Sequence, residues 1–103
     1  MDTMTFDYYL MRRQANPDLS MKNVLAVARR VRPIQAVCWG YRHNRWEARS
    51  DVARVWLDPD RDDLILQPAD RATAERTAAT FTEVPLPTEA ELTEICRAAP
   101  RPR

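Results

Sequence analysis

Val37-Cys38-Trp39-Gly40-Tyr41-Arg42-His43-Asn44-Arg45-Trp46-Glu47-Ala48-Arg49 is the stretch that decides the fold. It holds two of the three tryptophans, the single glycine and the single histidine. Side chains alternate between the two faces of a strand, so a two-residue turn at His43-Asn44 predicts a hairpin with two different faces. In that hairpin Tyr41 pairs with Trp46, and Trp39 pairs with Ala48. The opposite, largely cationic face carries Arg42, Arg45, Glu47 and Arg49.

Two further elements are predicted before the hairpin. The aromatic and long apolar residues of Thr5 to Arg12 favour a strand. From Met21 to Val31 the apolar residues follow the spacing of one helix face, and Pro33 ends the predicted helix. Capping residues stand before this helix at Asn16, Asp18 and Ser20, and its last turn is cationic, with Arg29, Arg30 and Arg32.

The segment after the hairpin allows two interpretations. Val52 to Leu57 favours a strand, but Trp46 to Leu57 also fits a helix, because Ala53 and Trp56 share a helical face with Trp46. Asp58 to Asp63 is typical of a turn. A short strand then follows over residues 64–67 and ends at Pro68.

Two helices are predicted near the C-terminus. Residues 69–80 form a helix whose apolar residues before Phe81 are all alanines, and residues 82–87 are extended. Thr88 and Glu91 form a capping box, in which each side chain accepts from the other residue's backbone N–H. The helix that this box begins has one apolar stripe, formed by Leu92, Ile95, Cys96 and Ala99.

These elements predict a single α+β domain over residues 1–99 and a frayed tail over residues 100–103. The expected architecture is a four- to five-stranded, mainly antiparallel sheet with two or three helices packed on one face. A split β-α-β arrangement of the ferredoxin-like kind is one candidate topology.

Composition narrows the class of protein. The chain is 45% apolar and 30% charged, which is globular, and no run approaches the roughly 18 apolar residues of a membrane span. Its first residues carry acids where a secretory signal carries cations, so we expect a cytoplasmic protein without membrane contact. Cys38 and Cys96 are then expected to be reduced, and the spacing of a zinc site is absent. No cofactor is predicted.

Charge is unevenly distributed although the net charge is only +1. Six arginines and one glutamate lie between Arg29 and Arg49, so a cationic patch is expected there. Arginines beside aromatic rings are typical of both protein interfaces and nucleic-acid sites. The hairpin separates the two residue types onto opposite faces, which disfavours stacking on nucleic acid. It favours the interpretation that Trp39, Tyr41 and Trp46 are core residues and that the arginines form a solvated sheet face. The candidate partner-binding residues are Arg42, Arg45, Arg49 and Trp46, with Arg29 and Arg30 if the preceding helix ends nearby.

Three other patterns are weak. Asp58, Asp60 and Asp62 resemble the start of a calcium loop, but Asp63 stands where that loop needs glycine. Cys38 and His43 could form a thiol nucleophile and its base, although they lie apart along one predicted strand. Gly40, inside a strand, indicates a bulge or the close approach of another backbone, an aromatic ring or a helix.

We therefore expect a small non-catalytic protein-binding module of the regulatory, inhibitor or immunity kind that forms a homodimer. An RNA- or DNA-binding accessory protein that uses the arginine face is the alternative. A small enzyme with a carboxylate-lined pocket comes third, because no catalytic motif is present in the sequence.

Overall fold

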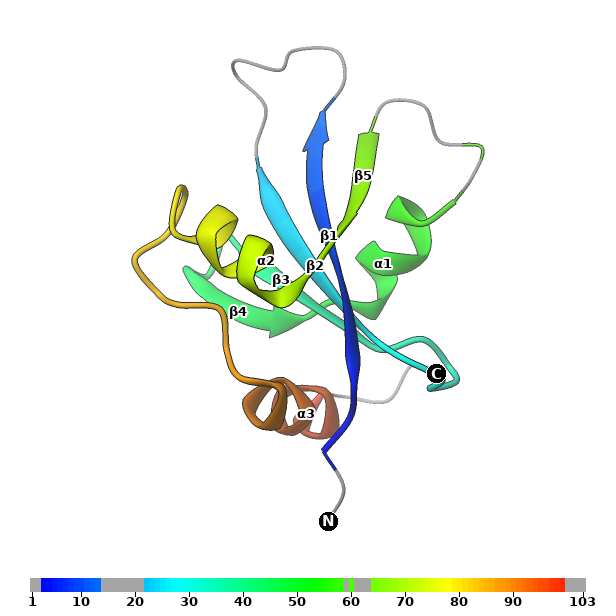
Figure 1. The fold of residues 1–103 in the computed structure, drawn as a ribbon. Coiled ribbons are helices and arrows are strands. Elements are labelled where there is room, and N and C mark those ends of the chain that lie inside the picture. Colours follow the sequence, from blue (N-terminus) through cyan, green and yellow to red (C-terminus); the bar gives the residue numbers. More distant parts are fainter. Residues whose placement is uncertain (1–2, 14–21, 59, 61–63, 100–103) are drawn as a thin grey trace.

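Five strands form one antiparallel sheet in the computed structural model, which describes residues 3–13, 22–58, 60 and 64–99 (Figure 1). The strands are β1 (Phe6–Arg13), β2 (Asn23–Ala28), β3 (Ala36–Gly40), β4 (Arg45–Ala48) and β5 (Leu64–Ala69). The helices are α1 (Ser50–Trp56), α2 (Arg71–Ala78) and α3 (Glu89–Ala98). The predicted α+β class and its antiparallel sheet are confirmed. The strand order β4-β3-β2-β1-β5 makes the first four strands a meander, which differs from a split β-α-β arrangement.

Helices cover both faces of the sheet. Helices α2 and α3 pack on one face, where the larger core cluster includes Val24, Val37 and Leu92. Helix α1 packs on the other face (Figure 1), where Ala53 belongs to the same buried cluster as Leu25 of β2. The prediction of helices on one face therefore holds for α2 and α3, while α1 lies opposite them.

The helix predicted from Met21 to Val31 is wrong, because residues 23–28 form β2. This strand lies in the middle of the sheet, and five of its six residues are buried. A strand that is buried on both faces carries an unbroken apolar run, and such a run also matches one face of a helix. The arginines predicted for a last helical turn instead follow the strand, and Arg30 has a positive φ of 61°. The predicted caps at Asn16, Asp18 and Ser20 lie outside the described residues.

The central hairpin exists, but its turn is longer than predicted. Trp39 pairs with Trp46 and Cys38 with Glu47, so the pairing is shifted by two residues from the expected register. A shift of two keeps every strand residue on its predicted face. Residues 41–44 form the turn, in which Asn44 has a φ of 58° and its N–H donates to the Gly40 carbonyl at 2.7 Å. Tyr41 and Arg42 therefore lie in the turn and not on the sheet.

The strand predicted over Val52 to Leu57 is also wrong. Helix α1 occupies this segment, so the helical alternative is correct from Ser50 onward, while Trp46 belongs to β4. The predicted short strand is present as β5 and continues through Pro68, which pairs with Tyr9 at the sheet edge. An edge strand tolerates proline because its missing N–H can face away from the sheet.

The C-terminal helices follow the sequence closely. Helix α2 begins after Asp70, whose side chain accepts from the Thr73 N–H at 2.7 Å. The capping box of α3 is confirmed, with the Thr88 N–H donating to Glu91 at 3.0 Å and the Glu91 N–H donating to Thr88 at 3.2 Å. The predicted stripe faces the core through the buried side chains of Leu92 and Cys96.

Candidate functional site

Cationic and aromatic side chains gather at the turn between β3 and β4. We define the tip surface as the exposed residues Lys22, Tyr41, Arg42, His43 and Arg45. Lys22 belongs to it because the Tyr41 hydroxyl donates to the Lys22 carbonyl at 2.6 Å. Neither Arg42 nor Arg45 forms an ion pair with another described residue. Their charges are therefore available to an anionic partner.

Tyr41 is the exposed end of a series of aromatic contacts that starts in the core. Its side chain is 42% exposed, and its ring lies 6.0 Å from the ring of Phe81. Phe81 in turn lies 6.2 Å from Trp46, which packs edge-on against Trp39 at 5.4 Å. A ring held in this way loses little conformational entropy when a partner binds it. Tyr41 is thus an exposed ring whose position on the tip surface is fixed from below.

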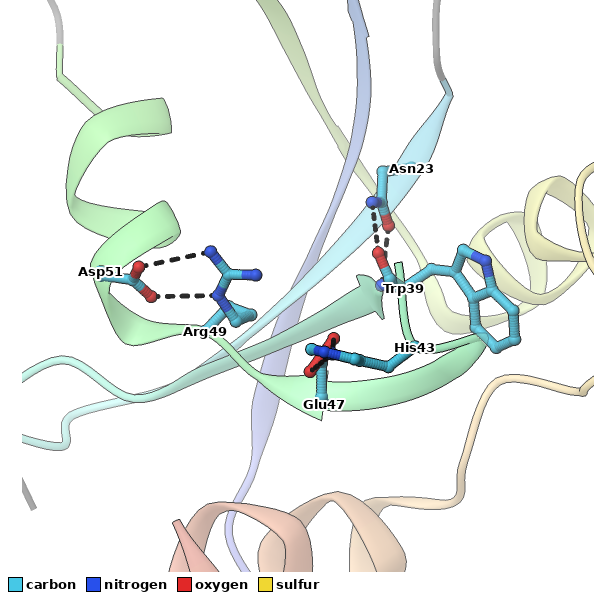
Figure 2. A network of polar contacts seen from close by, with 6 residues as sticks. All are labelled: Asn23, Trp39, His43, Glu47, Arg49 and Asp51. Atoms are coloured by element: carbon cyan, nitrogen blue, oxygen red, sulfur yellow. Dashed lines mark hydrogen bonds and ion pairs between the residues drawn. The ribbon is translucent and has the colours of Figure 1, made fainter. Parts of the chain in front are cut away.

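Asn23 fixes the strand that leads into the tip. Its buried side chain donates to the Trp39 carbonyl at 2.9 Å and accepts from the Trp39 N–H at 2.9 Å (Figure 2). The recorded β2–β3 pairs end at Leu25 and Cys38, so the amide of Asn23 replaces a backbone partner beyond that point. Asn23 was not identified as important from the sequence. Its signal in the sequence is a single amide side chain at the start of an apolar run.

His43, which belongs to the tip surface, pairs with Glu47 of β4. The Nδ1 atom of His43 lies 3.0 Å from each carboxylate oxygen of Glu47, whose side chain is only 14% exposed (Figure 2). Gly40 makes room for this carboxylate, because a Cβ atom at residue 40 would lie 1.7 Å from Glu47 Oε1. The predicted close approach at Gly40 is therefore made by the Glu47 carboxylate and not by a backbone, an aromatic ring or a helix.

The structure brings together only part of the predicted arginine face. Arg42 and Arg45 lie at the tip, whereas Arg49 lies at the other end of β4, paired with Asp51 at 3.2 Å (Figure 2). Arg29 and Arg30 follow the far end of β2, where the Arg29 Nε donates to Asp7 at 3.0 Å. These three arginines are therefore separated from the tip by the length of a strand.

Trp46 lies in the core, as the apolar face of the predicted hairpin favoured, and its side chain is not part of the tip surface. Its side chain is 6% exposed within the larger core cluster, and its Nε1–H donates to the Val84 carbonyl at 3.1 Å. The side chain of Trp46 therefore supports the tip surface from below. Tyr41 takes the aromatic role that the sequence had suggested for Trp46.

The two cysteines are both buried, and both thiols have raised pKa values. Burial raises the pKa of Cys38 to about 12 and that of Cys96 to about 11. His43, the base suggested for Cys38 in the sequence, pairs instead with Glu47. Because the thiolate is the reactive form, these environments oppose nucleophilic chemistry.

We therefore expect neither Cys38 nor Cys96 to react appreciably with iodoacetamide in the folded protein at neutral pH. The same thiols should react fully once guanidinium has unfolded the chain. Mass spectrometry after timed quenching measures both rates. Rapid modification of one native thiol at neutral pH would contradict the burial described here.

A cavity of about 780 Å³ lies beside β1, α2 and the start of α3. At its wall the Tyr8 hydroxyl donates to Glu89 at 3.1 Å and accepts from Arg71 at 3.1 Å. Glu89 also accepts from the Phe6 N–H at 3.0 Å, and burial raises the pKa of Tyr8. The carboxylates of the cavity all hold intramolecular partners, which gives them a structural role; they belong to Asp7, Asp70, Glu75 and Glu89.

The described part of the chain contains no group of three or more His, Cys, Asp and Glu side chains placed to hold a metal ion. Asp60 donates its N–H to Asp58 at 2.9 Å, as in a turn, and the rest of the calcium-like pattern lies largely outside the described residues. None of the described helices has the length and apolar character needed to cross a bilayer.

No protein family, no curated protein and no solved structure matches the chain.

Proposed function

We propose that the chain is a non-catalytic protein-binding module that holds an acidic segment of a partner protein on its tip surface. The observation that carries the proposal is the exposed ring of Tyr41 beside the uncompensated guanidinium groups of Arg42 and Arg45. Tyrosine and arginine are the residues that most often supply binding energy at protein interfaces. Cationic groups around such an anchor favour a partner with carboxylates and speed its approach.

The contacts beneath the surface support a fixed binding site. Tyr41 is tied to the Lys22 carbonyl and packs on Phe81, and Asn23 fixes the strand before the turn. A partner would therefore meet a surface that needs little ordering on association, so more of the contact energy remains as affinity.

Fluorescence anisotropy with a labelled peptide rich in Asp and Glu and carrying one tryptophan tests the proposal. The double substitution Lys22→Glu/Arg42→Glu should weaken binding at least tenfold, because it turns two attractive charges into repulsive ones; a tenfold loss corresponds to about 1.4 kcal/mol. Tyr41→Ala should weaken it similarly by removing the anchor. Arg54→Glu on α1 is the control for a charge reversal away from the tip surface: it makes the same change as either single reversal, half that of the double variant, and it should bind within about twofold of the wild type.

Single-stranded RNA is the second candidate ligand, and the position of Tyr41 favours it. The sequence placed the aromatic rings and the arginines on opposite faces, whereas Tyr41 and Arg42 lie together in the turn. A stacking ring beside cations is the composition of single-strand binding sites. Tight, salt-sensitive binding of labelled RNA, with a weak response to the acidic peptide, would favour this candidate over the first. Equal binding by the double variant and the wild type would exclude the tip surface for either ligand.

A further inference from the structure

Strand β4 forms one edge of the sheet, and its register decides which backbone groups face outward. The Arg49 N–H donates to the Ala36 carbonyl at 2.8 Å, so Arg49 faces β3. Backbone groups alternate in direction along an antiparallel strand, so those of Glu47 and Arg45 also face β3. The N–H and C=O groups of Trp46 and Ala48 therefore face away from the sheet. These outward groups have no hydrogen-bond partner among the described residues.

This edge has a charge pattern that is complementary to itself. Arg45 and Glu47 lie on one face of β4, and Arg49 follows at the same spacing. When a second β4 pairs antiparallel, outward residues must stand opposite outward residues. A twofold axis at Trp46 then places Arg45 opposite Glu47 of the partner subunit. The reciprocal contact repeats the pair, because a twofold interface uses each contact twice.

The axis at Trp46 is favoured over the other outward position. An axis at Ala48 would place Trp46 opposite Ser50 of the partner subunit, which begins α1, whereas the axis at Trp46 places Ala48 opposite Asn44 of the partner subunit, the last residue of the turn. The two axes therefore differ mainly in their charges: the Ala48 axis needs Arg49, which already pairs with Asp51, and the Trp46 axis uses Arg45, which has no ion pair with another described residue. An axis at Glu47 would also set outward groups opposite each other, but it is disfavoured because it opposes like charges, Glu47 with Glu47 and Arg45 with Arg49 of the partner subunit.

We propose that two copies of this chain associate through their β4 edges, with Trp46 on the twofold axis and Arg45 paired with Glu47 of the partner subunit. The two sheets then continue as one across the interface. Cross-strand pairs of opposite charge stabilise such a ladder, and like charges oppose it. Glu47 is already mostly withdrawn from water, so the pairing requires little further loss of its hydration. Because the strand is short, the association is weak and depends on concentration.

Reciprocal charge reversal tests both the interface and its register. Arg45→Glu alone opposes two carboxylates at each contact, and Glu47→Arg alone opposes two guanidinium groups, so each variant should be monomeric. A mixture of the two should form a heterodimer, because both contacts then join opposite charges. Sedimentation should give the wild type a mass that rises with concentration toward twice the 12.0 kDa of the chain. Arg54→Glu should behave as the wild type.

A second substitution covers the case in which Glu47→Arg disturbs the packing over Gly40. Ala48→Pro removes an N–H that faces away from the sheet, so the chain should keep its own ladder and lose the partner strand. Circular dichroism checks the fold of each variant. A wild type that stays monomeric at millimolar concentration overturns the proposal. So does dimerisation by either folded charge variant, or by Ala48→Pro, at the wild-type strength.

Arg45 belongs to both the tip surface and this interface, so the tip surface is tested through residues that lie outside β4. The substitutions Lys22→Glu/Arg42→Glu and Tyr41→Ala leave the β4 edge intact, so they should not change the oligomeric state. A failure of one proposal is therefore distinguishable from a failure of the other.

Discussion

Asn23→Ala is expected to lower the free energy of unfolding by about 2–4 kcal/mol, because it leaves the Trp39 N–H and C=O groups buried without partners. The same side chain also accepts from the Val24 N–H at 2.8 Å, so three backbone groups depend on one amide. Chemical denaturation followed by tryptophan fluorescence measures the change. A loss below about 0.5 kcal/mol, the size typical of a surface substitution, would show that water replaces the amide without cost.

Asn23→Asp is the matched variant that separates the two bonds. It keeps an acceptor for the Trp39 N–H but sets a carboxylate against the Trp39 carbonyl, so the charged form is disfavoured and the folded-state pKa is raised. Relative to the wild type at the same pH, the variant should lose stability as the pH rises above about 3.9, the pKa of an unfolded aspartate. Below that value the protonated side chain can donate again, and the difference should shrink. A difference that does not depend on pH would contradict the bond to the carbonyl.

Trp46→Ala is expected to cost about 3–5 kcal/mol, which is much of the stability of a small domain. The side chain is 6% exposed and contacts the rings of Trp39 and Phe81, so its removal opens a cavity at the centre of the aromatic cluster. Thermal unfolding by circular dichroism gives the loss directly. If the variant unfolds within 1 kcal/mol of the wild type, the side chain of Trp46 is not part of the packed core.

Trp46→Phe is the control for this effect. It keeps a ring in the cluster and removes the donor to the Val84 carbonyl. Because Val84 is 43% exposed, water can take over that carbonyl, and the expected cost is about 1 kcal/mol. If both variants lose a large part of the free energy of unfolding, Trp46 stabilises the fold through its hydrogen bond and not through its packing.

The sequence predicts those elements whose signals are local. The capping box of Thr88 and Glu91 satisfies its own helix end, so α3 could be predicted without knowing its neighbours. Strand β2 could not, because its apolar run depends on helices that cover both sheet faces, which only the tertiary structure reveals. The same holds for α1, because only the tertiary structure shows that Ala53 is buried in one cluster with Leu25 of β2.

Only part of the tip surface could be predicted from the sequence, because the sequence indicates which face a strand residue lies on but not the length of the turn. Alternation along the hairpin correctly places Arg45 and Glu47 on one face, because a register shift of two preserves the faces. It does not give the length of the turn, and the longer turn moves Tyr41 off the sheet and beside Arg42. Distances along the strands also separate Arg49 and Arg29 from the tip, although they are near it in the sequence.

The most direct test of the binding proposal is a titration of isotope-labelled protein with the acidic, tryptophan-containing peptide, followed by two-dimensional ¹⁵N–¹H NMR. The account predicts saturable shifts concentrated at Lys22 and residues 41–45, with smaller shifts at Phe81 beneath Tyr41. Shifts spread evenly over the exposed arginines would contradict it, as would shifts confined to the cavity beside β1. Either result would show that the tip surface is not where an acidic partner binds.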